Sequence, residues 1–315
     1  MEYIEKNEQK YTIIDKTLIR KYRQYLKLEK SFSNNTIGAY EKDLQKLLDY
    51  LEDIQLQAVN IKLENLHQFA ATLYDIDICP RSIARILSGI RAFYRFLILE
   101  HVIDNDPTEL LETPKIKKSL PEVLSVAEID RIIAAIDLSK DEGQRNRAII
   151  EMLYSCGLRV TELCQLKLSD LFLDQGFIRV LGKGNKERLV PISNRAIKEL
   201  QMWFIDRNTI QIKKGHEDFI FLSLRRGTAL SRIMIFHIVK ELTEICGIKK
   251  NISPHTFRHS FATHLLEGGA NLRAIQAMLG HESIATTEIY MHIEKSKLRE
   301  EILLHHPRNL KYQQQ

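Results

Sequence analysis

Six side chains in the second half of the chain are of types that could act together on a phosphate group. They are Arg159, Lys183, His255, Arg258, His281 and Tyr290. Arginine offers a planar fork of donors that matches two phosphate oxygens, and histidine exchanges a proton near neutral pH. A tyrosine hydroxyl can serve as a nucleophile that forms a covalent intermediate. Such a set could stabilise the negative charge that develops on a phosphodiester under attack by an oxygen nucleophile.

Each of these side chains also has an ordinary structural explanation when it is considered alone. Arg159 follows a glycine that can begin a helix, and Glu162, one turn later, could simply be its ion-pair partner. Pro254 suits the first position of a helix, so His255 and Arg258 share one face near the positive end of the helix dipole. That is a good anion site, but basic pairs at helix starts are not rare. Only the combination points to chemistry.

The sequence lacks the motifs of common nucleotide and metal sites. It has no Gly-x-x-x-x-Gly-Lys-Ser/Thr loop, no Gly-x-Gly-x-x-Gly after a strand and no His-Glu-x-x-His helix. His255 and His259 are four residues apart and could share a helix face, but no acidic or cysteine ligand stands in the same segment. We therefore predict neither a cofactor nor a bound metal.

The order and spacing of the six residues resemble the active site of the tyrosine recombinase family. Arg159 lies in Gly-Leu-Arg-x-x-Glu-Leu, Lys183 in Gly-Lys-Gly-x-Lys, His255 and Arg258 in Pro-His-x-x-Arg-His, His281 in Leu-Gly-His and Tyr290 in Thr-Thr-x-x-Tyr. Residues 182–191, 261–266 and 305–308 are especially similar to the Xer subgroup, and residues 35–44 look like the first helix of the family's core-binding domain. The resemblance covers nearly the whole chain after the residues that precede Asp15.

This resemblance implies a mechanism. Tyr290 would attack phosphorus to form a 3′-phosphotyrosyl link and a free 5′-hydroxyl, with His255 accepting the phenol proton and Lys183 acting as general acid. The two arginines and His281 would stabilise the transition state. Because the phosphotyrosine keeps the energy of the broken bond, neither ATP nor a metal ion is needed.

The first part of the sequence predicts helices throughout. Apolar residues have helical spacing over 17–28, 37–51 and, most clearly, 81–97. The face of 81–97 opposite its apolar face carries Arg81, Arg85, Arg91 and Arg95. A solvated face would account for these arginines, but the absence of any carboxylate among them favours contact with phosphates.

The second part predicts a mixture of helices and short strands. The expected helices are 127–136, 144–154, one beginning at 231, 254–268, 272–279 and one from 284 to the C-terminus. The expected strands are 177–180, 188–192 and 218–222, the first two forming a β-hairpin with a basic tip that carries Lys183 and Lys186. Arg232 opens a helix as a candidate phosphate contact. The helix over 292–304 could pack on its own domain, whereas the resemblance implies its donation to a neighbouring subunit.

A proline-rich stretch divides the two parts. Three of the seven prolines fall within 107–121, and proline disfavours helix at the residue before it. Lys115, Lys117 and Lys118 make this linker basic. The predicted organisation is an N-terminal extension (1–14), a helical core-binding domain (15–104), a linker (105–122), a catalytic domain (123–308) and a tail (309–315). The predicted fold is mainly α with a small antiparallel β-sheet in the catalytic domain, arranged as a two-domain C-shaped clamp.

Composition excludes secreted, membrane, fibrous and disordered proteins. The net charge is only +5, but residues 1–110 carry 15 basic and 17 acidic side chains, whereas residues 111–315 carry 31 and 24 and hold nine of the eleven histidines. This basic second part favours a polyanionic partner. Four cysteines are too few for a disulfide scaffold, and no signal peptide or long apolar run is present, so we predict a cytoplasmic protein.

Together these features predict a site-specific DNA recombinase, and the resemblance to the Xer subgroup implies that it resolves chromosome dimers at a dif-like site during segregation and cell division. The expected partners are double-stranded DNA at a specific site and, from the resemblance, a related recombinase in a homo- or heterotetramer and a DNA translocase as regulator. A phage or mobile-element integrase and a type IB topoisomerase are alternatives with the same chemistry. A non-catalytic DNA-binding protein would be expected to lose catalytic residues, and a metal-dependent nuclease would need a carboxylate cluster.

Overall fold

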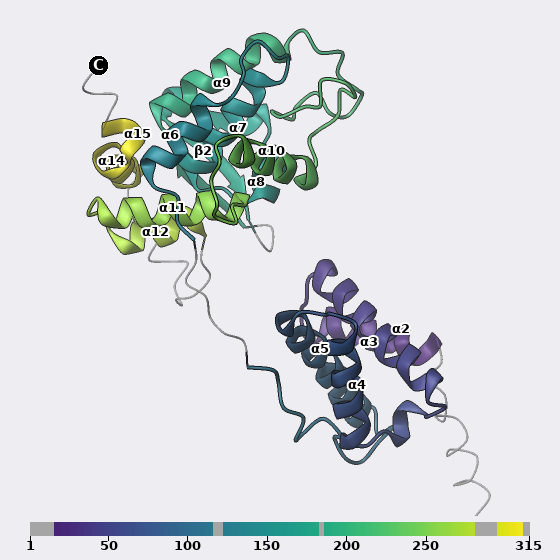
Figure 1. Ribbon diagram of the computed structural model, residues 1–315. Helices are drawn as coiled ribbons and strands as arrows, with labels where there is room; N and C mark the ends of the chain where they lie inside the picture. Colours follow the sequence, from purple (N-terminus) through teal and green to yellow (C-terminus); the bar gives the residue numbers. More distant parts are fainter. Residues whose placement is uncertain (1–15, 116–121, 183–185, 281–294, 311–315) are drawn as a thin grey trace, which may run out of the picture. The chain divides into compact units, whose positions relative to one another are not determined.

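The chain divides into two compact units, residues 1–119 and 120–315. The structure is a computed structural model that describes residues 16–115, 122–182, 186–280 and 295–310 (Figure 1). Most of the described chain is helical, with a small antiparallel sheet in the second unit. The predicted fold class of a mainly α protein with a small antiparallel sheet is therefore confirmed.

The first unit is a bundle of α-helices around its own hydrophobic core. Its elements are α2 (Lys16–Leu28), α3 (Asn34–Asp53), the 3₁₀ turn η1 (Ala58–Asn60), α4 (Leu63–Asp75) and α5 (Pro80–Leu99). Proline suits the first turn of α5, where its missing N–H costs no hydrogen bond. The apolar face of α5 supplies much of the core, and its Phe93 ring packs edge-on against Tyr22 at 5.1 Å.

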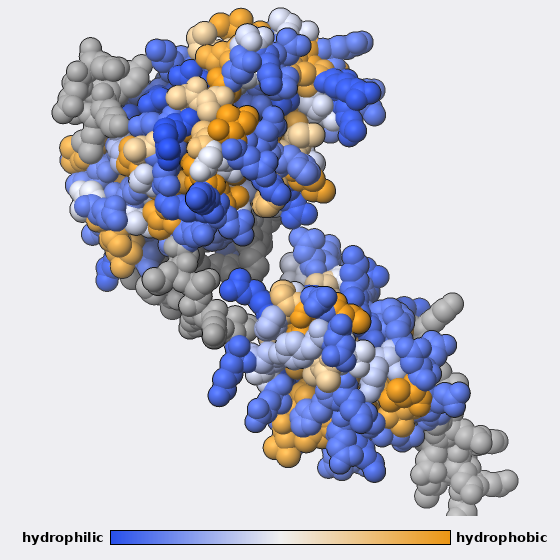
Figure 2. Space-filling model, in the orientation of Figure 1, coloured by the Kyte–Doolittle hydropathy of each residue, from blue (hydrophilic) through white to orange (hydrophobic). Residues whose placement is uncertain are grey.

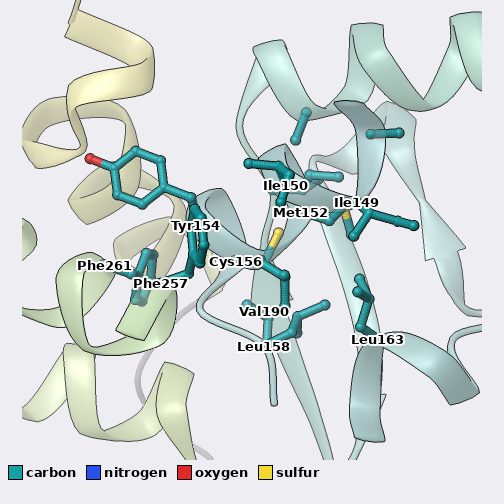
Figure 3. Close-up of a cluster of buried hydrophobic side chains, with 14 of the residues drawn as sticks. Ile149, Ile150, Met152, Tyr154, Cys156, Leu158, Leu163, Val190, Phe257 and Phe261 are labelled. Carbon is teal, nitrogen blue, oxygen red and sulfur yellow. The ribbon is translucent and has the colours of Figure 1, made fainter. Parts of the chain in front are cut away.

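The second unit is built around α7 (Gly143–Cys156). Around it lie α6 (Val126–Ala134), α8 (Val160–Gln165), α9 (Asn194–Arg207), α10 (Arg232–Ile245) and α11 (Pro254–Glu267). Helix α12 (Leu272–Leu279) packs against α11. Residues 148–156 of α7 are buried on every side, as expected for a helix in the middle of a core. In Figure 3, Phe257 and Phe261 of α11 lie beside Tyr154 of α7, while Ile149 and Met152 point into the other side of the core.

The sheet of the second unit has the strand order β1-β2-β3. Its strands are β1 (Leu171–Phe172), β2 (Phe177–Leu181) and β3 (Glu187–Pro191), all antiparallel. The hairpin of β2 and β3 pairs Ile178 with Val190 and Leu181 with Glu187, as the predicted basic-tipped hairpin requires. A hydrogen bond of 2.8 Å from Gly182 N–H to the Lys186 carbonyl closes the base of its tip.

The predicted strand over 218–222 is wrong. Phe219 and Leu222 form only isolated bridges, to Lys167 and Ala229. The reason lies in α9, because Arg207 donates to the carbonyl of Phe219 at 2.8 Å and Trp203 donates to the carbonyl of Ile220 at 2.9 Å. These carbonyls are therefore taken by side chains, not by a neighbouring strand.

The sequence analysis also missed α9 itself. The buried face of this helix includes the polar residues Glu199 and Arg207, which interrupt the apolar periodicity. Both are satisfied inside the unit, since Arg147 Nε lies 3.1 Å from Glu199 Oε1 and Arg207 donates to backbone carbonyls. Ala196, Leu200 and Trp203 on the same face do have helical spacing, so the signal in the sequence was weakened by the two polar residues but not absent.

The surface is mixed in character. On the face shown in Figure 2, hydrophobic residues form separate patches among hydrophilic ones. None of the helices in the described parts of the chain is long and apolar enough to cross a membrane. The four cysteines, Cys79, Cys156, Cys164 and Cys246, are all free thiols.

The C-terminal helices pack on their own unit. Helix α14 (Lys295–His305) places Ile302 in the core, and α15 (Pro307–Leu310) follows after a break at His306 (Figure 1). Arg308 is buried, with its Nε 3.1 Å from Glu151 Oε2 and with a second ion pair to Asp130. Residues 295–305 of this predicted helix pack on their own unit in the single chain, and donation to a neighbouring subunit stays a prediction. Residues 284–294 lie outside the described residues.

His306 makes the second unit sensitive to acid. Its ring is fully buried 4.8 Å from the Tyr154 ring, and burial together with the charge of Arg308 lowers the pKa of His306 to about 3. The unfolded chain binds this proton near pH ~6.5, so the native state loses stability as pH falls below that value, by at most ~1.4 kcal/mol per pH unit.

We therefore expect the melting temperature to fall more steeply between pH 7 and pH 5 in the wild type than in His306→Gln, whose side chain does not titrate. Differential scanning calorimetry at matched ionic strength measures both curves. His264, which also has a lowered pKa, is present in both proteins. Parallel curves would contradict the prediction.

Candidate active site

The backbone around Arg159 is fixed by the end of the central helix. Helix α7 ends at Cys156, and Gly157 follows with φ of +58°, a conformation that L side chains rarely adopt. A Cβ atom at Gly157 would lie 2.4 Å from the Phe261 ring, so only glycine fits here. Arg159 then stands at the N-cap of α8, where its backbone N–H donates to Glu162 at 2.8 Å.

Glu162 gathers three arginines. Its carboxylate accepts from Arg159 Nη1 at 2.8 Å and from Arg188 Nη1 and Nη2 at 2.9 Å each, and Arg258 Nη1 lies 3.8 Å away. The Glu162 side chain is only 3% exposed. Burial disfavours its charge, but the hydrogen bonds and charge of Arg188 and the hydrogen bonds from Arg159 outweigh burial and lower the pKa of Glu162. Glu162 is therefore ionised and fixed.

The C-terminal end of α12 holds the same three arginines. Arg188 Nε donates to the carbonyl of Met278 at 2.7 Å, Arg258 Nη2 donates to Leu279, and Arg159 Nη2 donates to Gly280 at 3.3 Å. These carbonyls carry the partial negative charge of the helix end, which favours cations. Three guanidinium groups from α8, α11 and β3 therefore converge on one helix terminus and one carboxylate.

Arg159 and Arg258 differ in exposure. The Arg159 side chain is 36% exposed, whereas that of Arg258 is 6% exposed and also donates to the Gly157 carbonyl at 2.8 Å. Burial and the nearby charge of Arg159 lower the pKa of Arg258 to about 10, so the group stays charged at neutral pH. A guanidinium has five N–H donors, and the bonds to Glu162, Gly157 and the end of α12 use two on each of these arginines. Both keep donors for an anion.

His255 lies one turn before Arg258 on α11, as predicted. The helix begins at Pro254, and the Ser253 backbone N–H donates to Thr256 Oγ1 at 3.1 Å. His255 is on the surface of the unit, and partial burial with the positive charge of Arg258, His259 and Arg159 lowers its pKa. The imidazole is therefore neutral at pH 7 and able to accept a proton.

The other three predicted catalytic residues, Lys183, His281 and Tyr290, lie outside the described residues. The structure thus brings together Arg159, His255 and Arg258 and leaves the remaining assignments as predictions. Arg188 was missed as a site residue. The available signal was a positive charge, three residues before Pro191, on an expected strand that pairs with a buried strand.

The predicted DNA-contacting arginines of α5 are of two kinds. Arg81, Arg85 and Arg95 are exposed, and Arg85 also forms an ion pair with the buried carboxylate of Asp43 on α3. Arg91 donates to the Leu111 carbonyl and, at 2.9 Å, to Thr113 Oγ1. Two of the four arginines therefore also hold the first unit together.

Arg91 and Arg95 line a hollow of about 360 Å³ on the first unit, together with Lys30 and the rings of Tyr25, Phe32 and Tyr40. The other predicted contacts are exposed where described: Lys115, Lys186 and Arg232, the last opening α10. Lys117 and Lys118 lie outside the described residues. Within the parts of the chain that the structure describes, no group of three or more histidine, cysteine or acidic side chains could hold a metal ion.

Comparison with known proteins identifies the family. Residues 122–297 match the phage integrase family, and residues 19–101 match the phage integrase N-terminal SAM-like domain. The chain is 43% identical over 293 residues to tyrosine recombinase XerD of Staphylococcus epidermidis, which covers 93% of this chain and 99% of that relative. The chain belongs to the phage integrase family of tyrosine recombinases. The resemblance predicted from the sequence is thereby confirmed.

Two further similarities support this membership. The chain is 41% identical to tyrosine recombinase XerD of Staphylococcus haemolyticus over 93% of its own length and 99% of that relative. Its fold is similar to that of the XerH site-specific recombinase bound to difH substrate in a pre-cleavage complex. That likeness has a TM-score of 0.64 and 25% identity, and it covers 81% of this chain and 76% of the other. The prediction that the chain is a recombinase is confirmed at the level of the family.

The positive charges at the site predict a lowered pKa for His255. The NMR titration of His255 should have its midpoint below the ordinary ~6.5, because cations nearby oppose its protonation. His259→Gln removes one of these cations and should raise the midpoint by a few tenths of a pH unit. His237→Gln, on α10, serves as the matched control and should leave it unchanged. A midpoint at or above 6.5 in the wild type contradicts the prediction.

Proposed function

We propose that this tyrosine recombinase cuts and rejoins DNA at a specific site through a 3′-phosphotyrosyl intermediate, with Arg159 and Arg258 holding the scissile phosphate. The observation that carries the proposal is the convergence of these guanidiniums at Glu162 and the end of α12. Attack on a phosphodiester adds negative charge to the non-bridging oxygens, and fixed cations are the main means of stabilising it. The arginines are already held in place before substrate binds, so they need little reorganisation.

The chemistry assigns one role to each remaining predicted residue. The Tyr290 hydroxyl oxygen attacks phosphorus, its proton passes to the neutral His255 imidazole, and the bond from phosphorus to the 5′-oxygen breaks. Lys183 protonates the leaving 5′-oxygen, and His281 donates to a non-bridging oxygen. Rejoining reverses these steps with a 5′-hydroxyl from the exchanged strand. The energy of the broken bond stays in the phosphotyrosine, so the residues account for the reaction without ATP or a metal ion.

The substrate is double-stranded DNA, contacted by both units. Arg81 and Arg95 are exposed on α5, and Arg232 and Lys186 are exposed on the second unit. Their charges suit phosphate contacts, which position a protein on the duplex without reading its sequence. Placing the two units on opposite sides of the duplex as a C-shaped clamp, joined by the linker with Lys115, remains part of this proposal.

In the cell we propose that the chain resolves chromosome dimers at a dif-like site during cell division, in the cytoplasm. The support is its identity of 43% to a XerD over 99% of that relative's length. It would act in a tetramer with identical subunits or with a related recombinase, under control of a DNA translocase.

The proposed mechanism requires Tyr290 for the covalent step. A duplex selected by the wild-type protein from a random pool, then nicked near the cleavage position, should trap a covalent protein–DNA adduct on a denaturing gel. The nick lets the short 5′-hydroxyl fragment diffuse away, so rejoining fails. Tyr290→Phe should form no adduct, and EDTA should not reduce the wild-type yield. An adduct in Tyr290→Phe, or its loss with EDTA, would overturn the proposed mechanism.

The role of Lys183 as general acid can be separated from the role of the arginines. Lys183→Ala should slow cleavage of an ordinary phosphodiester by roughly 10²–10⁴-fold, the usual contribution of general acid–base catalysis. A 5′-bridging phosphorothiolate at the same position should restore the rate, because a thiolate leaves without a proton. Arg159→Ala is the control and should gain little from the sulfur, since it acts on non-bridging oxygens. Equal rescue of the two variants would remove Lys183 from this role.

A further inference from the structure

We propose that Arg188 is a positioning residue, which keeps Arg159 and Arg258 available to the scissile phosphate by satisfying Glu162 and fixing the carbonyl end of α12. The inference rests on the proposed function of the site, because it names the group on which the two phosphate-binding arginines depend. It is argued from the hydrogen bonds that Arg188 donates to Glu162 and Met278.

Arg188 donates from all three of its nitrogens to groups inside the protein. Nη1 and Nη2 form a two-pronged pair with the two oxygens of Glu162 at 2.9 Å each, and Nε donates to the Met278 carbonyl at 2.7 Å. The side chain is 13% exposed, against 36% for Arg159. Arg188 is therefore bonded within the protein, whereas the more exposed Arg159 is open to a substrate.

The hydrogen bonds accepted by Glu162 show what would change if Arg188 were removed. A buried carboxylate is costly unless it is fully paired, and Arg188 supplies two charge-assisted bonds to Glu162. Without it, Glu162 would draw its missing donors from the arginines that remain beside it. Arg159 already reaches Oε1 at 2.8 Å, and Arg258 Nη1 needs to move less than an ångström from 3.8 Å to form a hydrogen bond. Donors spent on Glu162 are lost to the phosphate.

Arg188 also ties strand β3 to the end of α12. Gly280 ends α12 with φ of +64°, and a Cβ atom there would lie 3.2 Å from Arg188 Cδ. The arginine therefore packs against the backbone of Gly280 while it bonds to Met278. The carbonyls of Leu279 and Gly280, which hold Arg258 and Arg159, belong to this same turn. The Arg188 side chain therefore fixes the turn whose two carbonyls accept hydrogen bonds from Arg258 and Arg159.

The test measures how strongly the protein senses the charge of one phosphate. In a Tyr290→Phe background, which blocks cleavage, dissociation constants are measured for two duplexes with the cleavage site mapped by the wild-type adduct. One carries the ordinary phosphodiester at that position, and the other carries a neutral methylphosphonate. The ratio of the two constants isolates that charge, and general loss of folded protein changes both constants equally. Thermal melts report whether each variant is folded.

The Tyr290→Phe protein should bind the charged duplex at least about tenfold more tightly than the neutral one. Adding Arg188→Gln should reduce this ratio at least threefold, and adding Glu162→Gln to Arg188→Gln should restore it, because the unpaired carboxylate is gone. Arg179→Gln, on the paired strand β2, removes an arginine that bonds to Asp170 and should not change the ratio.

The outcomes separate the inference from the proposed function. If the wild type forms no covalent adduct, the proposed function fails and the inference falls with it. If the adduct forms but Arg188→Gln keeps the full ratio, only the role of Arg188 is overturned. It is also overturned if the ratio falls but Glu162→Gln does not restore it, because Arg188 would then act through the fold alone.

Discussion

The structure depends on holding three positively charged guanidinium groups close together on shared hydrogen-bond acceptors. Arg159, Arg188 and Arg258 would repel each other if they met without compensation. Compensation comes from the carboxylate of Glu162 and from the carbonyl end of α12, which together accept bonds from all three. The group keeps more positive than negative charge, and an added anion would therefore relieve the remaining repulsion. A phosphate is such an anion.

This constraint explains why several elements of the second unit meet at one place. The arginines come from α8, α11 and β3, so the helix ends and the strand must meet within hydrogen-bond distance. The buried helix α7 provides the common support, and Gly157 allows the chain to turn closely past Phe261 into α8. A larger residue at Gly157 would move the N-cap of α8 and with it Arg159. The packing of the apolar core therefore determines where the charged side chains of the site lie.

Sequence reasoning identified those parts of the fold and site that follow from local pattern. Pro254 placed His255 and Arg258 on one turn, and the Gly-Lys-Gly tract predicted the hairpin, because both signals are contained in a few residues. Helix α9 was missed because Glu199 and Arg207 face the core, and 218–222 was wrongly predicted as a strand because α9 side chains take its carbonyls. Arg188 was missed for a similar reason: its partners are distant in sequence, and no local spacing reports them.

The arginines of both units show why net charge is a poor measure of affinity for DNA. On α5, Arg81, Arg85 and Arg95 are all exposed, but Arg85 also pairs with Asp43, and Arg91 donates to the Leu111 carbonyl. In the second unit, Arg188 is committed internally so that Arg159 and Arg258 can act on an anion. Counting basic residues gives each of these the same weight. Phosphate binding instead depends on which guanidiniums keep donors free, and internal acceptors such as Asp43 and Glu162 decide that.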